Sequence, residues 1–170
     1  MADSNSVWEG LAAGLVGGLV ASWTMNRFQD AWSSLASRDD KSQAEQSQQT
    51  EPADDTTVKA ASAISEGLFH HRLTEGEKKL AGPAVHYSLG TVVGGLYGAA
   101  AEVMPEVTSG AGLPFGAAFW LVVDEGAVPL LGLAKGPAAY PLSTHAYALA
   151  SHLVFGLTTE SVRRLVRGIW

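Results

Sequence analysis

Ionisable residues inside apolar stretches are the residues of this chain whose types and spacing could carry chemistry. Asp124 and Glu125 interrupt one apolar stretch, and His145 and His152 lie in the next. At about 1.5 Å per helical residue, Asp124 and His152 each lie roughly 15 Å from the start of their stretch. Antiparallel neighbours would place Asp124 or Glu125 beside His152, where an acid and an imidazole ease each other's burial. His145 and His152 are seven residues apart and share a helix face.

These groups admit three interpretations. The first is a structural polar cluster that fixes how the helices pack. The second is a path for protons or small ions, since chains of Asp, Glu and His mark such paths in membranes. The third is a metal or haem site built from imidazoles on facing helices. The candidate polar cluster comprises His86, Glu102, Asp124, Glu125, His145 and His152, and its metal-ligand candidates are His86, His145 and His152.

No recognised catalytic motif accompanies these residues. The chain has no Walker loop, no HExxH and no GxSxG sequence. We therefore expect a protein that is not an enzyme and predict no cofactor, with haem or metal left open. A net charge of -6 also argues against a nucleic-acid partner.

Four apolar stretches have the length that a membrane-spanning helix requires, about 20 residues. They cover residues 8–25, 83–104, 114–133 and 142–162. The sequence thus predicts an all-α, polytopic membrane protein of about four transmembrane helices, with one long polar insert between the first and second. A soluble helical bundle is the alternative. The bilayer is the expected partner, together with a possible homo-oligomer or membrane-complex subunit.

The charged residues concentrate in the polar insert. Residues 33–57 are rich in Gln, Ser and Asp and predict a flexible linker. Apolar residues at helical spacing from Val58 to Leu68 then predict a short amphipathic helix. Thr74 and Glu77 have capping-box spacing, so a helix is expected to start there and run towards Pro83. The expected segments are 1–29 (tail and first span), 30–57 (linker), 58–82 (amphipathic segment) and 83–170 (three-helix block with a basic tail).

Small residues form two stripes with a spacing of four. Gly10, Gly14 and Gly18 mark the first span, and a second set marks the span from residue 83. Small residues let helix backbones approach closely in lipid, so both stripes predict helix–helix contacts. The partner helix could lie in the same chain or in a second copy. The second set comprises Gly90, Gly94 and Gly98.

Basic residues near span ends predict topology, because they favour the cytoplasm. They form two conflicting clusters in this chain. We expect the insert inside and both termini outside, since the short acidic N-terminus translocates easily. A re-entrant third stretch would instead place both clusters in the cytoplasm. The first cluster comprises Arg27, Lys78, Lys79 and Lys135, and the second comprises Arg163, Arg164 and Arg167.

Three runs of sequence resemble a known family. They are LAGPAVHYSLGTVVGGLYGAAAE, GAGLPFGAAFWLVVDEGAVPLLGL and YPLSTHAYALASHLVFGLTTESVRRLVR. They are similar to the YagU-like family of uncharacterised bacterial inner-membrane proteins, closely over residues 80–167 and loosely over the first span. The resemblance implies a multi-pass protein of the bacterial cytoplasmic membrane and transfers no activity. Its specific motifs fall on His86, Gly90, Gly94, Asp124, Glu125, His145 and His152.

Overall fold

The computed structural model describes residues 4–39 and 53–169, and this part of the chain is helical and contains no strand. The long helices are α1 (Ser4–Asp39), α2 (Ala53–Phe69), α3 (Glu75–Val103) and α6 (Leu142–Arg167). Between α3 and α6 lie shorter helical pieces: η2 (Pro105–Gly112), α4 (Leu113–Val122), η3 (Val123–Ala127), α5 (Val128–Leu130) and η4 (Pro137–Ala139). The all-α class expected from the sequence is confirmed.

Helix α1 is longer than the apolar stretch that predicted it. Its 36 residues span about 54 Å, well beyond the roughly 30 Å of a bilayer core. The predicted linker, residues 30–57, overlaps α1 up to Asp39 and α2 from Ala53. The centre of that prediction, residues 40–52, lies outside the described residues.

Helices α2 and α3 form a hairpin, and α3 begins at the predicted capping box. The Glu77 carboxylate accepts a hydrogen bond from the Thr74 backbone N–H at 2.7 Å, and the Thr74 hydroxyl accepts one from the Glu77 N–H. Hydrogen bonds to the carboxylate from the Thr74 backbone, the Thr74 hydroxyl and His71 lower the pKa of Glu77 to about 2, the Thr74 backbone contributing most. Helix α3 then continues through Pro83, so the expected start and the expected second span belong to one helix.

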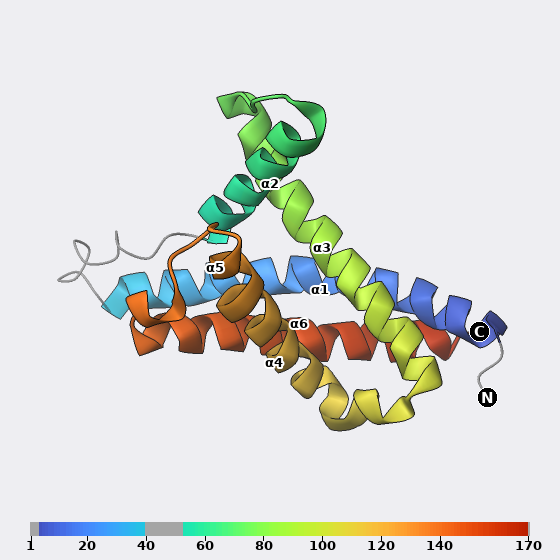
Figure 1. Ribbon diagram of the computed structural model, residues 1–170. Coiled ribbons are helices and arrows are strands. Elements are labelled where there is room, and N and C mark those ends of the chain that lie inside the picture. The colour runs from blue at the N-terminus through green and yellow to red at the C-terminus, as the bar shows by residue number, and fades with distance from the viewer. Residues whose placement is uncertain (1–3, 40–52, 170) are drawn as a thin grey trace.

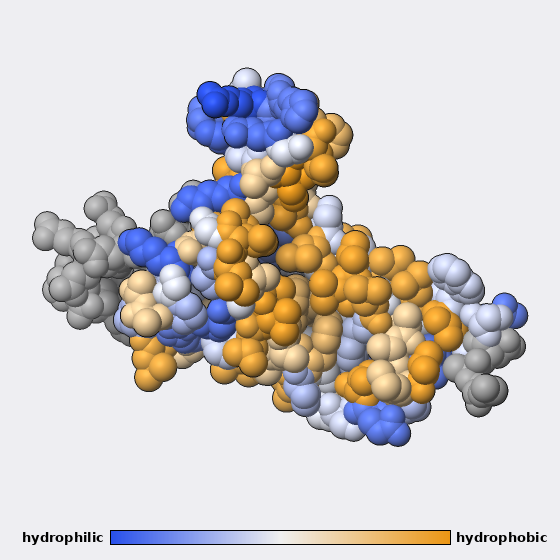
Figure 2. Space-filling model, in the orientation of Figure 1, coloured by the Kyte–Doolittle hydropathy of each residue, from blue (hydrophilic) through white to orange (hydrophobic). Residues whose placement is uncertain are grey.

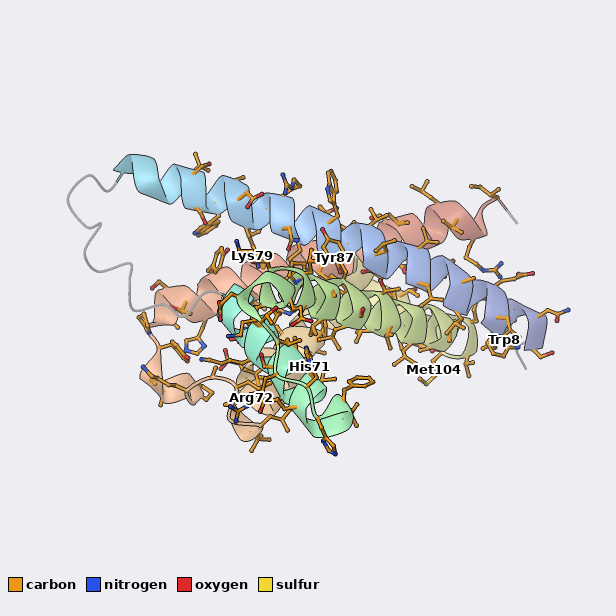
Figure 3. All side chains as sticks on the ribbon, turned by 90° about the horizontal axis from the view of Figure 1, so that it is seen from above. Trp8, His71, Arg72, Lys79, Tyr87 and Met104 are labelled. Carbon is orange, nitrogen blue, oxygen red and sulfur yellow. The ribbon has the colours of Figure 1, made fainter. Side chains whose placement is uncertain are left out.

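Helices α1 and α6 run antiparallel, and α3 and α4 cross them (Figure 1). The rings of Trp32 in α1 and Tyr147 in α6 have centroids 5.8 Å apart at one end of this pair. At the other end, Arg167 Nη1 lies 2.5 Å from Glu9 Oε2. The start of α1 and the end of α3 also meet there, as Trp8 and Met104 show in Figure 3. Both described ends of the chain therefore lie together.

The distribution of side chains is inverted relative to a water-soluble domain. The largest fully buried side chains are Phe155, Glu160, Thr159, Ser22 and Ser151. A small apolar core of Ala21, Met25 and Phe155, flanked by Phe115 and Phe119, accompanies them. Large apolar side chains of α1, α3, α4 and α6 are exposed instead, and Figure 2 shows them as a broad apolar surface.

One described stretch, Pro105–Leu130, is long and apolar enough to cross a membrane by length and composition. It contains the third predicted span, with its two acids. The long helices α1, α2, α3 and α6 do not meet that criterion. An apolar helical stretch suited to crossing a membrane is therefore confirmed, and the four crossings stay a prediction.

Candidate functional site

A π-helical turn presents two neighbouring acids to helix α6. Residues Val123–Ala127 form this turn between α4 and α5. A π-turn holds more residues than an α-turn, and such widened turns occur frequently at functional sites. Asp124 contacts His152, and Glu125 contacts His145. We call these four residues the acid–histidine site.

Glu125 and His145 form the shorter of the two pairs. Glu125 Oε1 lies 2.6 Å from His145 Nδ1, and both side chains are largely buried. The other ring nitrogen, Nε2, lies 3.1 Å from the Pro137 carbonyl oxygen. A carbonyl only accepts, so Nε2 carries a hydrogen and donates it. A hydrogen bond at Nδ1 then needs a further proton between the imidazole and the carboxylate. The 2.6 Å contact therefore places one proton between the ring nitrogen Nδ1 and the carboxylate.

Asp124 and His152 form a looser pair. Asp124 Oδ2 lies 3.6 Å from His152 Nδ1, which donates a hydrogen bond to the Ala148 carbonyl oxygen at 3.0 Å. The His152 side chain is 7% exposed and the Asp124 side chain 35%. The imidazole is thus held by its own helix, while the carboxylate opens towards the surface and is the more accessible proton acceptor.

The remaining members of the predicted polar cluster lie elsewhere. His86 Nε2 lies 3.5 Å from the Ser22 carbonyl oxygen of α1, and its ring packs edge-on against Tyr87. Glu102 bonds to arginines of α6. Within the described part of the chain, no three His, Cys, Asp or Glu residues form a group suited to a metal ion. The six predicted residues are therefore divided among three places.

A second ionic cluster joins the ends of α1, α3 and α6. Its centre is Glu160, which is 1% exposed and accepts hydrogen bonds from Arg163 Nε at 2.7 Å and Arg164 Nε at 2.5 Å. The Tyr97 hydroxyl of α3 donates to the same carboxylate at 3.0 Å. We call this cluster the arginine–carboxylate site; its charged members are Glu9, Glu102, Glu160, Arg163, Arg164 and Arg167.

Arg167 extends this site across three helices. Its Nε donates to Glu102 of α3 at 2.9 Å, and its Nη1 donates to Glu9 of α1. From the sequence, the arginines were interpreted only as a topology signal, and Glu160 was not singled out. The spacing of Glu160 to Arg163 and Arg164, three and four residues along a helix, is the signal that could have indicated these ion pairs.

The two predicted glycine stripes face each other within the chain. A β-carbon on Gly94 would lie 2.6 Å from the Gly14 carbonyl oxygen and 2.6 Å from the Gly18 Cα. A β-carbon on Gly10 would meet Glu102 and the Gly98 carbonyl, and one on Gly90 would meet Ser22. The backbones of α1 and α3 are therefore in direct contact, which any larger residue would prevent.

A second close contact joins α4 to α6 and was not foreseen from the sequence. A β-carbon on Gly156 would lie 2.7 Å from the Gly116 backbone nitrogen and would also meet the Gly112 carbonyl. Gly112 additionally has φ +83°, a conformation that L side chains rarely adopt. This contact places the π-turn against His145 and His152. Gly112 and Gly116 are four residues apart, as in the two stripes, but two positions are a weak pattern.

The described part of the chain is all-helical, with one stretch suited by length and composition to crossing a membrane. The chain belongs to the family described as a protein of unknown function (DUF1440), whose profile matches residues 44–161. The YagU-like resemblance is consistent with this membership. The match includes the whole acid–histidine site. No curated protein and no solved structure matches the chain.

Proposed function

We propose that this protein is an integral membrane protein of four spans, α1, α3, α4 and α6, whose acid–histidine site takes up and releases protons. The observation that carries the proton function is the contact between Glu125 and His145. His145 Nε2 donates to the Pro137 carbonyl, so the 2.6 Å contact between Nδ1 and the Glu125 carboxylate holds one proton between a base and an acid. Ionisable groups at membrane depth are costly and are commonly functional.

The inverted distribution of side chains supports the membrane setting. Water-soluble monomers rarely expose large continuous apolar patches, whereas lipid-facing helices do so by necessity. Leu96 on α3 is 61% exposed and Leu121 on α4 is 58% exposed, while Glu160 and Ser151 are buried. Helices in lipid associate through small residues and buried polar groups, as the α1–α3 and α4–α6 contacts do.

The arrangement of helix ends supports an even number of crossings. Arg167 at the end of α6 contacts Glu9 at the start of α1. Tyr147 near the start of α6 contacts Trp32 near the other end of α1. A re-entrant third stretch would bring the end of α6 to the opposite face from the start of α1. Four spans therefore suit the geometry better than three.

We place the protein in the bacterial cytoplasmic membrane as a multi-pass protein, as the family resemblance implies. The insert side, with Lys78, Lys79 and Lys135, faces the cytoplasm. The acid–histidine site lies nearer this side, since Pro137 of the adjoining turn contacts His145. Proton uptake from the cytoplasm would suit a role in pH or envelope homeostasis.

Proton flux in proteoliposomes tests the proposal. We expect Glu125→Gln and His145→Asn to reduce flux by about tenfold or more, because each removes one partner of the contact that holds the proton. Asp124→Asn and His152→Asn should reduce it similarly, because each removes a proton acceptor at membrane depth. Glu106→Gln is the matched control, since Glu106 is an exposed acid of η2 outside both sites. Circular dichroism and size-exclusion chromatography would verify folding of each variant. Equal flux in folded variants and wild type would reject proton handling and leave a structural polar cluster.

Two other functions remain distinguishable. A scaffold that assembles through Gly90, Gly94 and Gly98 is weakened because these glycines contact α1 of the same chain. A haem or metal protein would show a visible spectrum or stoichiometric metal after purification. His152→Ala would abolish that signal if His152 were a ligand.

A further inference from the structure

Aromatic side chains lie between the two ionisable sites. Phe115 and Phe119 come from α4, and Phe155 comes from α6. Their ring centroids lie 5.2 Å apart for Phe119–Phe155, 6.1 Å for Phe115–Phe155 and 6.3 Å for Phe115–Phe119. We call these three residues the aromatic layer.

The aromatic layer touches each site directly. On one side, Phe119 packs edge-on against the His152 ring, with centroids 5.2 Å apart. On the other side, Phe115 stacks on the Tyr97 ring at 4.1 Å, and the Tyr97 hydroxyl donates to Glu160. Between His152 and Tyr97, the contacts therefore run only through the three phenylalanine rings, which carry no hydrogen-bonding group.

Close backbone packing adjoins the aromatic layer. Gly116 follows Phe115 and Gly156 follows Phe155, and a β-carbon on either glycine would meet the opposite helix. Phe155 itself is 1% exposed. The α4 and α6 backbones are therefore in direct contact beside the aromatic layer.

We propose that Phe115, Phe119 and Phe155 form a dry barrier that keeps the arginine–carboxylate site, with Glu160 at its centre, separate from the acid–histidine site. Apolar constrictions block ions and water by dewetting, and protons need a hydrogen-bonded path. Each site then exchanges with its own side of the membrane, and passage between them requires the rings to move. The proposal deepens the proton function and rests on it for the proton, while the barrier is testable without any flux.

Cysteine accessibility tests the barrier, because the natural chain contains no cysteine. Asp124→Cys places a thiol of similar volume at the acid–histidine site and leaves His152 in contact with Phe119. A membrane-impermeant maleimide is added to oriented proteoliposomes on the side of Glu160. We expect slow labelling of this variant and labelling about tenfold faster or more when Phe119→Ala is added.

Two matched variants control the labelling experiment. Phe69→Ala removes a phenylalanine that is 74% exposed and distant in the fold, and should leave labelling slow. Phe119→Leu keeps a large apolar side chain at this position and should also leave the labelling slow. If Phe119→Ala does not fold, Phe115→Ala takes its place. Equal labelling rates with and without the alanine substitution overturn the barrier.

Proton flux separates this proposal from the preceding one. Faster labelling after Phe119→Ala supports the barrier. If proteins that retain Asp124 then show no proton flux, the proton function is rejected and the barrier is not. Unchanged labelling rejects the barrier whatever the flux. With both proposals correct, Phe119→Ala in the chain that retains Asp124 raises the proton leak, and Asp124→Asn suppresses that increase.

Discussion

At the scale of single residues, Glu160 is the acid most completely removed from solvent among the described side chains. Its carboxylate accepts hydrogen bonds from two arginines and a tyrosine on two helices. Removing one partner of a buried ion pair is strongly destabilising, because the remaining charge loses its compensation. Without the Glu160 charge, Arg163, 9% exposed, would keep only the Glu102 carboxylate at 3.5 Å as an ion-pair partner within the described chain.

We therefore predict that Glu160→Gln lowers the free energy of unfolding by about 3 kcal/mol or more. Glutamine keeps the shape and one acceptor but not the charge. Denaturant titration in detergent micelles, followed by tryptophan fluorescence, measures the change. Glu106→Gln, at an exposed acid of η2, should lie within about 0.5 kcal/mol of wild type. Equal effects of the two substitutions would contradict a stabilising role for the Glu160 ion pairs.

The sequence predicted part of the candidate site. Depth along two helices indicated that Asp124 or Glu125 would lie beside His152, and Asp124 does so. Assigning Glu125 to His145 required the π-turn, whose extra residue no periodicity reveals. Glu102 was grouped with the histidines because it lies in an apolar stretch, but its partners come from the C-terminal end of α6. Such pairings depend on which helices touch, and a single sequence does not contain that information.

At the scale of elements, helix boundaries were predicted best where side chains cap them. Thr74 and Glu77 marked the start of α3, because a capping box acts through neighbouring residues alone. The flexible linker predicted from the polar insert overlaps helices at both ends, because α1 continues to Asp39 and α2 starts at Ala53. Composition indicates whether a segment can bury apolar surface. A helix that extends from a stable helix into solvent needs no buried face of its own.

The α1–α3 contact leads to a prediction at this scale. We expect Gly94→Ala to lower the free energy of unfolding by about 1–3 kcal/mol, the usual cost of overpacking. Its β-carbon would lie 2.6 Å from backbone atoms of α1, which cannot rotate away as a side chain could. Thermal unfolding in detergent measures the effect. Gly67→Ala on α2, with nothing within 4 Å, is the control and should be neutral or stabilising.

At the scale of the whole molecule, the described chain buries polar and small residues and exposes large apolar ones. The proposed arrangement of four spans in a bilayer would account for both halves of this pattern. The arginine–carboxylate site joins α1, α3 and α6 at the face where both described ends lie. The acid–histidine site lies towards the opposite face, beside the turn that contains Pro137. The molecule thus has two chemically different faces joined by helices.

Single cysteines in the cysteine-free chain test this topology. We expect Gly76→Cys and Gly136→Cys to react with an impermeant maleimide from the cytoplasmic side, because both lie on the insert side. Glu106→Cys and Ile169→Cys should react from the opposite side. A cytoplasmic Ile169→Cys, with Gly136→Cys and Glu106→Cys both external, would instead indicate a re-entrant third stretch. Labelling after membrane solubilisation confirms that each thiol is reactive.

The backbone contacts at Gly14, Gly94, Gly116 and Gly156 have a consequence for genetic screens of this protein. Any substitution there pushes two helices apart, and at Gly116 and Gly156 it also shifts the π-turn from its histidines. Under the proposed proton function, a saturation screen for loss of function would therefore rank these glycines beside Asp124 and His152, although a glycine has no side chain that could transfer a proton. Sorting the hits by protein abundance would separate the two groups, since the glycine variants would be degraded and the proton-site variants would accumulate.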